Sequence, residues 1–433
     1  MLDIRRLRAA PEEARRSLSR RNDPDVPGLL DQALDLDRRR RQLLEAVERL
    51  KAERNRASRE IGERKRTGED APDLIAAMRG VAEEIRELDA RLSGVEERLR
   101  EVLLRIPNFP DERVPPGEEG EGEVVKEAGE AARRARQVRP HWELTGGESG
   151  SLDGAVLDLA RGAKVAGSGF PLLVGKGARL ARALIDFMLN LHVEEHGYLE
   201  VSPPLLVNRD SMRCTGHLPK FEGDAYRTEP DDLFLVPTAE VPLTNLHRDE
   251  LVDGSRLPLA YVAYTPCFRR EAGAAGRDTR GLLRVHQFDK VELVRFAHPE
   301  RSAEELELLT GHAERVLELL ELPYRRVLLP AGDLGFANAI TYDLEVWAPG
   351  VGEWLEVSSC SSYTDYQARR AGIRFRPAPG ASPEFVHTLN GSGVALARTI
   401  VALVENGYEP GRGIRLPEAL HPYLGFDRID EPT

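Results

Sequence analysis

The residues with the clearest chemical potential lie between Thr265 and Glu292. Arg269 supplies a planar guanidinium, which can hold a phosphate through two parallel charge-assisted hydrogen bonds. Glu271 supplies a carboxylate that can accept a hydrogen bond from an exocyclic amine, and Phe288 supplies a flat face on which a purine could stack. These residue types together indicate a site for a purine that carries a polyphosphate.

A simpler structural interpretation fits the same segment. Runs of apolar β-formers flank a Gly- and Arg-rich centre without helical period, which predicts a strand, a long loop and a second strand. Together they would form an antiparallel hairpin with a basic loop. An isolated Phe-Arg-x-Glu motif is more often a solvated hairpin edge than a nucleotide site, because short motifs recur by chance.

Composition limits the classes of protein to consider. The chain has 433 residues, enough for two or three domains, and its net charge of −12 argues against nucleic acid wrapped over the whole surface. Three isolated cysteines indicate neither a zinc ribbon nor a disulfide scaffold, and reduced thiols fit a cytoplasmic protein. The arginine-bearing N-terminus precedes no long apolar run, and no stretch has eighteen consecutive apolar residues, so we expect neither a signal peptide nor a membrane span.

A heptad pattern dominates the first hundred residues. Apolar residues recur every seven positions from Leu29, with companions between them as far as Ile61, and a second series runs from Leu74 to Val102. Gly68, Asp70 and Pro72 separate the two series. The pattern predicts an antiparallel coiled-coil hairpin over about residues 27–103, within an N-terminal domain of residues 1–105.

The two arms of this predicted hairpin differ in charge. Residues 37–66 contain twelve Lys or Arg against six Asp or Glu, whereas residues 69–105 contain six against ten. In a chain of negative net charge, a locally positive arm favours contact with nucleic acid. Solvated basic residues and salt bridges on a coiled-coil surface would give the same composition, so both interpretations remain open.

The rest of the chain predicts a linker and a larger domain. Residues 106–140 are rich in Pro, Gly and Glu and predict an extended linker, after which a domain spans residues 141–433. Its apolar periodicity predicts helices at 178–196, 306–320 and 394–406 and strands at 198–201, 342–347 and 354–359.

Three segments of the larger domain carry polar residues in apolar surroundings. The β-like run 232–243 is interrupted by Thr238-Ala239-Glu240, whose carboxylate could accept hydrogen bonds from an ammonium. Glu356 stands on an apolar strand before a polar turn, and beside phosphates it would need a hard cation such as Mg²⁺, to which Ser359 could add an oxygen. A Gly-rich turn at 389–393 precedes a helix carrying Arg398, which can reach a phosphate. Taken singly, each segment is more often strand filler or surface charge.

The order of these motifs resembles that of the class II aminoacyl-tRNA synthetases, in the form seen in the bacterial-type seryl-tRNA synthetases. The segment from Phe268 to Phe288 resembles the second signature motif, 178–204 resembles the first, which forms a dimer interface, and 389–423 resembles the third. The Thr238-Ala239-Glu240 triplet is similar to the loop with which this family holds serine. The N-terminal hairpin resembles the family's tRNA-binding arm, so the likeness covers essentially the whole chain.

The resemblance implies a fold and a function. The fold would be α+β, an antiparallel sheet flanked by helices and preceded by the helical hairpin. The function would be ATP-dependent ligation of L-serine to tRNA(Ser) in two steps through seryl-adenylate, with release of pyrophosphate and AMP, and it leaves room for charging of tRNA(Sec). The implied partners are ATP, Mg²⁺, L-serine, tRNA and a second copy of the chain, in the cytoplasm.

The resemblance also implies roles for individual residues. Arg269 would hold the α-phosphate, Glu271 would accept from the adenine amine, Phe288 would stack on the ring, and Arg284 and Arg398 would hold the outer phosphates. The catalytic set would be Arg269, Glu356 and Arg398, with Glu356 and Ser359 as the metal ligands. The serine pocket would comprise Thr238, Ala239, Glu240, Glu292, Asn390 and Ser392. The ATP site would comprise Arg269, Arg270, Glu271, Arg284, Val285, Phe288, Glu356, Val357, Ser358, Ser359 and Arg398.

Four positions depart from the family pattern, and they leave room for a specialised second copy of the enzyme. Arg270 stands where Ser is frequent, Ser362 where Asn is common, Ala397 where Gly is usual, and Gly169 where Arg is frequent.

Two rival functions carry sequence signatures of their own. A synthetase-like ligase that loads a carrier protein should lack the N-terminal arm, and a non-catalytic RNA-binding scaffold should have lost Arg269, Glu356 or Arg398. The chain has the arm and all three residues.

Overall fold

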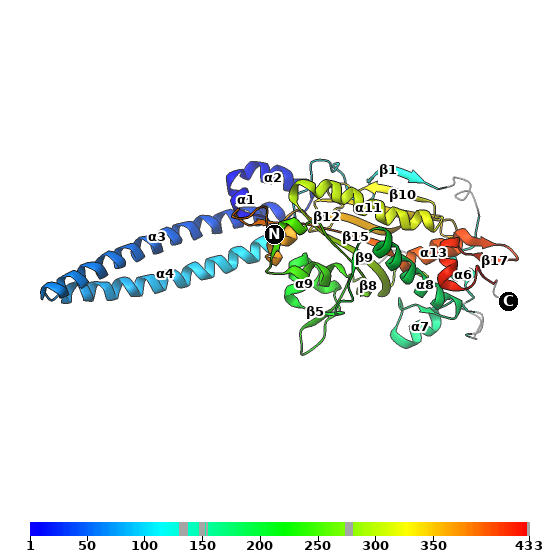
Figure 1. Cartoon of the computed structure of the whole chain (residues 1–433), viewed down its shortest axis with the longest axis horizontal. Helices are drawn as coiled ribbons and strands as arrows, with labels where there is room; N and C mark the ends of the chain where they lie inside the picture. The colour runs from blue at the N-terminus through cyan, green and yellow to red at the C-terminus, as the bar shows by residue number, and fades with distance from the viewer. Residues whose placement is uncertain (130–136, 147–151, 153–154, 273–279, 431–433) are drawn as a thin grey trace. The chain divides into compact units, whose positions relative to one another are not determined.

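The computed structural model describes residues 1–129, 137–146, 152, 155–272 and 280–430. They form two compact units (Figure 1). Unit 1 comprises Met1–Ser19 and Asp23–Pro107, and unit 2 comprises Arg20–Asn22 and the chain from Asn108 onward. Across these described ranges, no helix has both the length and the apolar character that a bilayer crossing requires.

Unit 1 is the predicted helical hairpin with two short helices before it. Its elements are α1 Ile4–Ala9, α2 Pro11–Ser19, α3 Val26–Thr67 and α4 Pro72–Leu104. The helices α3 and α4 run side by side along their length (Figure 1). Gly68 ends α3 in the left-handed conformation with φ +83°, and Pro72 stands at the first turn of α4, where its missing N–H costs no hydrogen bond. The predicted coiled-coil hairpin is confirmed.

A buried charge ties the base of the hairpin together. Asp37 of α3 is 1% exposed and accepts a hydrogen bond from Arg8 of α1 at 2.9 Å. Arg40 and Arg41 reach the same carboxylate from one turn along α3. Burial opposes the charged form of Asp37, but the hydrogen bonds from Arg8 and Arg40 outweigh it and lower its pKa.

Unit 2 is built on one eight-stranded sheet in the order β1-β10-β11-β12-β15-β9-β8-β4. Every neighbouring pair is antiparallel except β4 with β8, which confirms the predicted mainly antiparallel α+β fold. In chain order the strands are β1 Glu123–Ala128, β4 Leu199–Glu200, β8 Leu259–Phe268, β9 Gln287–Ala297, β10 Tyr324–Leu328, β11 Ile340–Ala348, β12 Glu353–Ser362 and β15 His387–Ala395.

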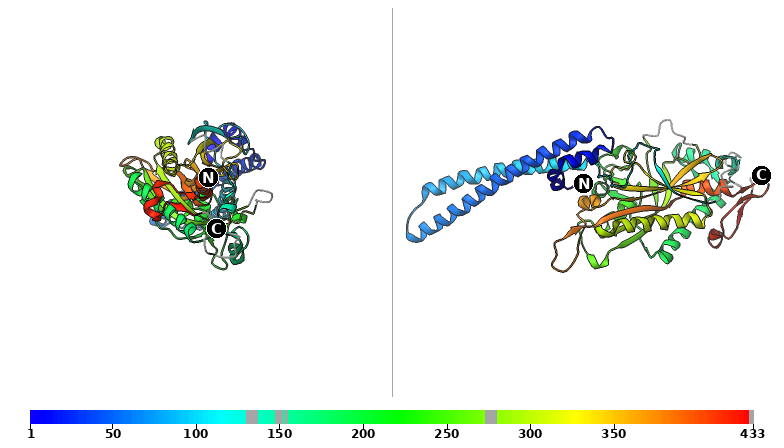
Figure 2. Two further views of the ribbon diagram at one scale, coloured as in Figure 1. Left: turned by 90° about the vertical axis from the view of Figure 1, so that its right-hand side faces the viewer. Right: turned by 90° about the horizontal axis from the view of Figure 1, so that it is seen from above.

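Helices pack their apolar faces on this sheet. They are α8 Lys176–Asn190, which continues as a π-helical turn to Glu195, α11 Ser302–Leu319 and α13 Leu396–Gly407. Figure 2 shows the strands fanning across the unit with α11 along one side. Leu184, Leu309 and Val401 from the three helices are fully buried with Leu293 and Leu344 of the sheet, so one core holds the sheet rigid beneath the site.

Smaller elements complete unit 2. They are α6 His141–Leu144, β2 Leu157–Asp158, α7 Leu159–Ala166, β3 Leu172–Leu173, β5 Leu206–Asn208, α9 Arg209–Thr215, β6 Leu233–Leu235, α10 Glu240–Thr244, β7 Leu251–Asp253, α12 Tyr366–Ala371, β13 Arg374–Arg376, β14 Glu384–Phe385, β16 Tyr408–Glu409, β17 Gly413–Arg415, α14 His421–Leu424 and β18 Arg428–Ile429. The short strands among them form four separate small sheets, β14-β13-β7, β16-β17-β18, β2-β3 and β5-β6.

The Gly-rich segment 389–393 is not a turn, as the sequence predicted, but part of strand β15. The strand pairs with β9 from Leu389 to Ser392, shifts register at Gly393 and pairs again from Val394, and α13 begins only at Leu396. A Cβ on Gly391 would lie 2.5 Å from a methyl of Leu309 and 2.8 Å from the sulfur of Cys360, and one on Gly393 would lie 2.5 Å from His192. The glycines are therefore required by close packing on both faces of a central strand.

Three other local predictions also differ from the structure. Within the run 232–243, only β6 is a strand, and Glu240 begins the short helix α10. The N–H of Glu240 donates a hydrogen bond to Thr238 Oγ1 at 3.1 Å. The turn predicted after Ser359 is the continuation of β12 to Ser362, followed by α12. The predicted linker 106–140 contributes β1, an edge strand of the main sheet.

The chain returns to nearly the same point of unit 2 after building the hairpin. Arg21, which is 7% exposed, donates through Nη2 and Nε to the carbonyl of Asn108 at 2.8 and 3.0 Å. Its Nη1 donates to the carbonyls of Leu334 and Gly335, each at 3.1 Å. Burial lowers the pKa of Arg21 to about 10, so the group remains a cation at neutral pH. One arginine thus fastens residues 20–22 to the chain at 108.

Candidate active site

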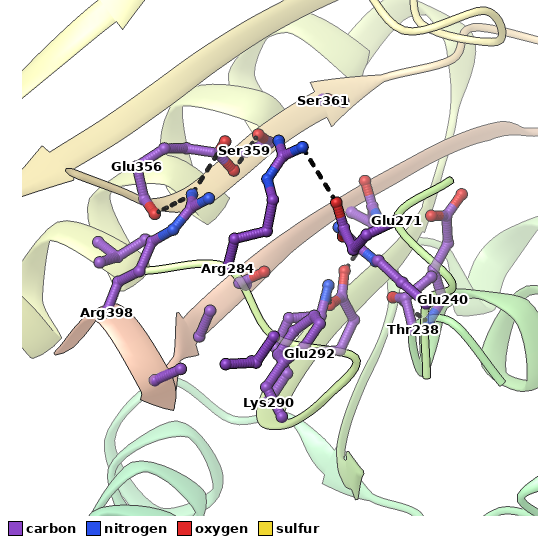
Figure 3. Close-up of a pocket in the computed structure, with 18 of the residues that line it drawn as sticks. Thr238, Glu240, Glu271, Arg284, Lys290, Glu292, Glu356, Ser359, Ser361 and Arg398 are labelled. Carbon is purple, nitrogen blue, oxygen red and sulfur yellow. Dashed lines mark hydrogen bonds and ion pairs between the residues drawn. The ribbon is translucent and has the colours of Figure 1, made fainter. Parts of the chain in front are cut away.

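A cavity of about 430 Å³ opens on the face of the sheet (Figure 3). Its walls come from β8, β9, β12 and β15, from the loop before α10 and from the first turn of α13. Of the predicted site residues, it gathers Thr238, Glu240, Arg269, Glu271, Arg284, Val285, Phe288, Glu292, Glu356, Val357, Ser359, Asn390, Ser392 and Arg398. Residues from 238 to 398 thus meet at one place because antiparallel strands distant in sequence are neighbours in the sheet.

The partly exposed side of the cavity, here called the outer wall, consists of Arg269, Glu271, Arg284, Phe288, Glu356, Ser359 and Arg398. The buried side, here called the inner pocket, consists of Thr238, Glu240, Lys290, Glu292, Tyr363, Asn390 and Ser392. In Figure 3, Glu356 and Arg398 lie at one end of the cavity and Thr238 and Glu240 at the other.

The predicted strand–loop–strand hairpin supplies half of the outer wall. β8 pairs antiparallel with β9 from Leu259 to Phe268, and residues 273–279 of the loop lie outside the described residues. The guanidinium of Arg269 lies 5.1 Å from the centre of the Phe288 ring. Glu271 and Arg284 form an ion pair at 3.2 Å. A cation, an aromatic face and a carboxylate–arginine pair therefore stand within reach of one bound molecule.

The other half of the outer wall gathers hard oxygen atoms. Ser359 Oγ donates to Asp343 Oδ1 at 2.6 Å and lies 3.1 Å from Glu356 Oε1. Arg398 Nη1 donates to the carbonyl of Glu356 at 2.9 Å and lies 3.5 Å from its Oε2. Burial first, and then the charge of Glu356, raise the pKa of Asp343 well above its ordinary value. Two crowded carboxylates and a hydroxyl form a donor set that suits a hard divalent cation.

This donor set is small. Within the described ranges there is no cluster of three or more His, Cys, Asp or Glu placed to bind a metal. A cation here would take only one or two carboxylates from the protein and would need further oxygens from water or from a phosphate ligand. That is the coordination typical of Mg²⁺ at nucleotide sites.

The inner pocket is a closed hydrogen-bond network around two buried carboxylates. Gln367 Nε2 donates to Glu240 Oε1 at 2.7 Å. Asn390 Nδ2 donates to Glu292 Oε1 at 2.8 Å, and the hydroxyl of Tyr363 donates to Asn390 Oδ1 at 2.7 Å. The tyrosine therefore fixes which way the Asn390 amide faces, and thereby presents its N–H groups to Glu292.

Charges within the inner pocket oppose the effect of burial. Burial raises the pKa of both Glu240 and Glu292, while the nearby ammonium of Lys290, which is ion-paired with Glu292, lowers both. Burial and the neighbouring cations Arg269 and Lys290 lower the pKa of His217 to about 4, so the imidazole is neutral. The result is a buried, polar pocket with hydrogen-bond acceptors for a cation and a hydroxyl.

Sequence reasoning missed four residues of this arrangement: His217, Lys290, Asp343 and Tyr363. Two carried a usable signal. Lys290 precedes Glu292 by two positions on a strand, which places both side chains on one face, and Asp343 interrupts an apolar strand as Glu356 does. His217 and Tyr363 follow α9 and β12 in irregular segments, and nothing in their local sequence marks them.

Three predicted residues do not line the cavity. Ala239 is fully buried beneath it. Ser358 Oγ donates to the carbonyl of Ser392 at 2.7 Å and so supports the inner pocket from behind. Arg270 extends in another direction and donates to the carbonyl of Gly223 at 3.2 Å.

The departure from the family pattern at Gly169 has a packing reason. Gly169 has φ +81°, and its carbonyl accepts a hydrogen bond from the N–H of His286 at 2.8 Å. A Cβ at this position would lie 2.5 Å from the imidazole ring of His286. This backbone leaves no space for a side chain, so an arginine here would displace the loop that follows Arg284.

Comparison with known proteins gives one consistent result. The model of the seryl-tRNA synthetase N-terminal domain matches residues 1–110, and that of the class II tRNA synthetase core domain (G, H, P, S and T) matches residues 220–407. The serine–tRNA ligase of Gemmatimonas aurantiaca is 52% identical to this chain, over 98% of this chain and 99% of that protein. The serine–tRNA ligase of Thermomicrobium roseum is 53% identical, over 98% and 94%.

Two solved structures share the whole fold. Seryl-tRNA synthetase from Pyrococcus horikoshii, complexed with ATP, has a TM-score of 0.92 at 37% identity and covers 100% of both chains. The cytoplasmic serine–tRNA ligase from Naegleria fowleri, in complex with AMP, has a TM-score of 0.87 at 27% identity and covers 100% and 99%. Given also the relatives that match along nearly their full length, the chain belongs to the seryl-tRNA synthetase family.

Proposed function

We propose that the protein ligates L-serine to tRNA(Ser) with ATP, through seryl-adenylate. This proposal rests on one observation: a single cavity contains both an arginine-rich outer wall and a small inner pocket with two buried carboxylates. The first suits the phosphates and base of ATP, and the second suits a small amino acid with a hydroxyl. The named relatives along the full chain support the same assignment.

The outer wall would bind ATP. Arg269 holds the α-phosphate, on which negative charge builds during attack, and Phe288 stacks on adenine beside it. Glu271 accepts from the adenine amine, which would require Arg284 to leave the ion pair at 3.2 Å and turn to the phosphates. Arg398, held by the carbonyls of Leu283 and Glu356, is already aimed at the cavity. Positioning and charge stabilisation, not a protein nucleophile, supply the rate enhancement.

Glu356 and Ser359 would hold Mg²⁺. Asp343 would orient the hydroxyl of Ser359, from which it accepts a hydrogen bond. The crowding of Asp343 against Glu356 supports this assignment, because a cation would relieve the repulsion between them. When bound there, Mg²⁺ would supply positive charge against the phosphates. The protein's own contribution is the placement of these oxygens on two rigid, adjacent strands.

The inner pocket would bind serine. One carboxylate takes the substrate ammonium, and the remaining acceptors and donors take the hydroxyl. The serine carboxylate oxygen then forms a bond to the α-phosphorus as the bond to pyrophosphate breaks. Alanine and glycine would leave buried polar groups of the pocket unpaired, which costs far more than the loss of a methyl contact.

The units would divide the work. Residues 1–105 form the tRNA-binding domain, in which the basic residues of α3 contact tRNA, and residues 141–433 form the catalytic domain.

We also propose a homodimer through the 178–204 segment, where β4 ends the sheet and Leu199 is 63% exposed. A cytoplasmic location fits the three free, buried cysteines. The same chemistry would charge tRNA(Sec) if tRNA(Sec) makes the same contacts with the N-terminal helical hairpin as tRNA(Ser) does.

Amino-acid-dependent ATP–pyrophosphate exchange, measured with all standard amino acids, tests the proposal. We expect exchange with serine alone, followed by charging of tRNA(Ser). Adenylate formation without charging would favour the carrier-protein ligase, and RNA binding without ATP turnover would favour the scaffold. Deleting residues 30–100 should spare exchange and prevent charging, whereas charging by the deletion variant would refute the role of the arm.

A further inference from the structure

Lys290 is a buried cation inside the inner pocket that no motif had marked. It lies on β9 with its side chain 9% exposed, two residues before Glu292 and on the same face of the strand. Its ammonium is ion-paired with Oε2 of Glu292, whose other oxygen accepts from Asn390. A lysine is seldom buried unless its charge is needed by a partner.

The groups around Glu292 come from every element that packs against it. Asn390 faces it from β15, Thr238 and Glu240 from the segment at the start of α10, Tyr363 from the end of β12, and His217 and Arg269 from the adjacent loops. His217 and Tyr363 are neutral, since burial lowers the pKa of the first to about 4 and raises that of the second well above its ordinary value. The charged groups are thus two carboxylates, Lys290 and Arg269.

The other cavity cations of the described residues have other partners. Arg284 pairs with Glu271, and Arg398 contacts Glu356, both in the outer wall. Arg269 stacks near Phe288, at the junction of the two halves. Among the lining residues that the structure describes, Lys290 is therefore the cation in ion-pair contact with an inner-pocket carboxylate.

We propose that Lys290 is a positioning residue for serine recognition, which keeps Glu240 and Glu292 ionised together in the empty pocket. This inference rests on the proposed function. With both carboxylates charged, one can take the substrate ammonium while the other accepts from the hydroxyl. Lys290 and Arg269 together balance the charges of the two carboxylates, so both carboxylates can stay ionised in a buried site.

Removing the lysine charge would change the protonation of the pair. Without Lys290 the two buried carboxylates would have only the charge of Arg269 to oppose their repulsion, so together they would retain one proton near neutral pH. A protonated carboxyl is a poor acceptor for an ammonium. Serine would then bind only after that proton leaves, and binding would weaken as the pH falls.

The test compares wild type with Lys290→Met and Lys290→Arg in serine-dependent exchange between pH 6 and 8.5. For Lys290→Met we expect the KM for serine to rise by about tenfold or more at pH 7, since one unit of pKa shift is a factor of ten, and to fall again toward pH 8.5. Changes in kcat and in the KM for ATP should be small. Lys290→Arg, which keeps the charge, should restore most of the pH independence.

A binding measurement separates this role from a purely structural one. Calorimetry of serine binding, in buffers of different ionisation enthalpy, should detect release of about one proton by Lys290→Met and almost none by wild type. The double variant Lys290→Met/Glu292→Gln should show no pH dependence beyond that of Glu292→Gln alone. If Lys290→Met fails to fold, Lys290→Gln is used in its place, because it keeps a hydrogen-bond donor without the charge.

The outcomes are distinguishable. Wild-type protein that fails to exchange with serine would overturn the proposed function and this inference with it. Wild-type exchange with serine, together with a pH profile and proton release unchanged in Lys290→Met or Lys290→Gln, would overturn the role of Lys290 alone.

Discussion

The two halves of the cavity handle negative charge in opposite ways. In the inner pocket, Glu240 and Glu292 are buried with a lysine of their own and with amide and hydroxyl donors already in place. In the outer wall, Glu356 is 46% exposed, stands beside Asp343 and contacts the cation Arg398. The inner pocket is complete before substrate arrives, whereas the outer wall needs charge that a ligand brings.

This difference suits the two substrates. A small amino acid offers few contacts, so selectivity requires a pocket whose polar groups are fixed in advance. ATP with a divalent cation would bring many charges, and a partly exposed wall could rearrange to receive them. The predictions below follow from that contrast, from the largest expected effect to the smallest.

Arg269 stands where the two halves meet, so its loss should affect both. Arg269→Ala should lower serine-dependent exchange by about 10³-fold or more, because a donor aimed at developing charge is lost. Arg270→Ala is the matched control, since its side chain lies on Gly223 outside the cavity, and should cost little. Near-normal exchange in Arg269→Ala, with an unchanged melting temperature, would refute the proposed role.

A substitution of Glu356 tests whether the outer wall requires a bound Mg²⁺. Glu356→Gln should lower exchange by about 10²-fold, raise the Mg²⁺ concentration needed for half-maximal rate and leave serine affinity almost unchanged. Glu353→Gln, an exposed change on the same strand, serves as control. Stabilisation of the protein by ATP with and without Mg²⁺, followed as a shift in Tm, gives a readout independent of activity. An unaltered Mg²⁺ requirement would contradict the assignment.

Tyr363 tests the inner pocket alone. Tyr363→Phe removes the donor that orients Asn390, so the KM for serine should rise by about tenfold while the Mg²⁺ requirement stays constant. Tyr366→Phe removes a comparable buried hydroxyl that accepts from Arg370 and lies outside the cavity lining. If both variants weaken serine binding equally, the effect is general to the core and not specific to the pocket.

His217 should matter for stability but not for neutral-pH catalysis. Its folded-state pKa of about 4 lies below the ordinary histidine value of 6.5, so the unfolded chain takes up a proton first as the pH falls. This costs up to about 3 kcal/mol of stability between pH 6.5 and 4. His217→Gln should lose less stability on acidification, measured by urea unfolding, with the same kinetic pH profile between 6.5 and 8.5. A kinetic change in that range would mean that the imidazole titrates during turnover.

The sequence predicted the outer wall better than the inner pocket, and the reason is physical. Arg269, Glu271 and Phe288 lie on one hairpin, so local spacing reports their spatial relation. In the inner pocket, Asn390 was named only through the family resemblance and Tyr363 was not named, because both reach Glu292 through the pairing of β15 with β9 and β12, which no local pattern encodes.

Local propensity also failed where tertiary packing decided the conformation. The glycines near 391 signalled a turn, but the space between Leu309 and Cys360 requires a strand without side chains at that point. The heptads of unit 1 were predicted correctly because a two-helix hairpin contains little beyond local periodicity and one partner helix.

The fastening of Arg21 to Asn108 makes the helical arm an insertion in the topological sense. Residues 23–107 leave unit 2 and return to it between two points that a single guanidinium holds together. The ends of such an excursion are fixed independently of its length, so heptads can be added or removed without opening the catalytic unit. Arm length can therefore change without altering how residues 20–22 and Asn108 are held in unit 2.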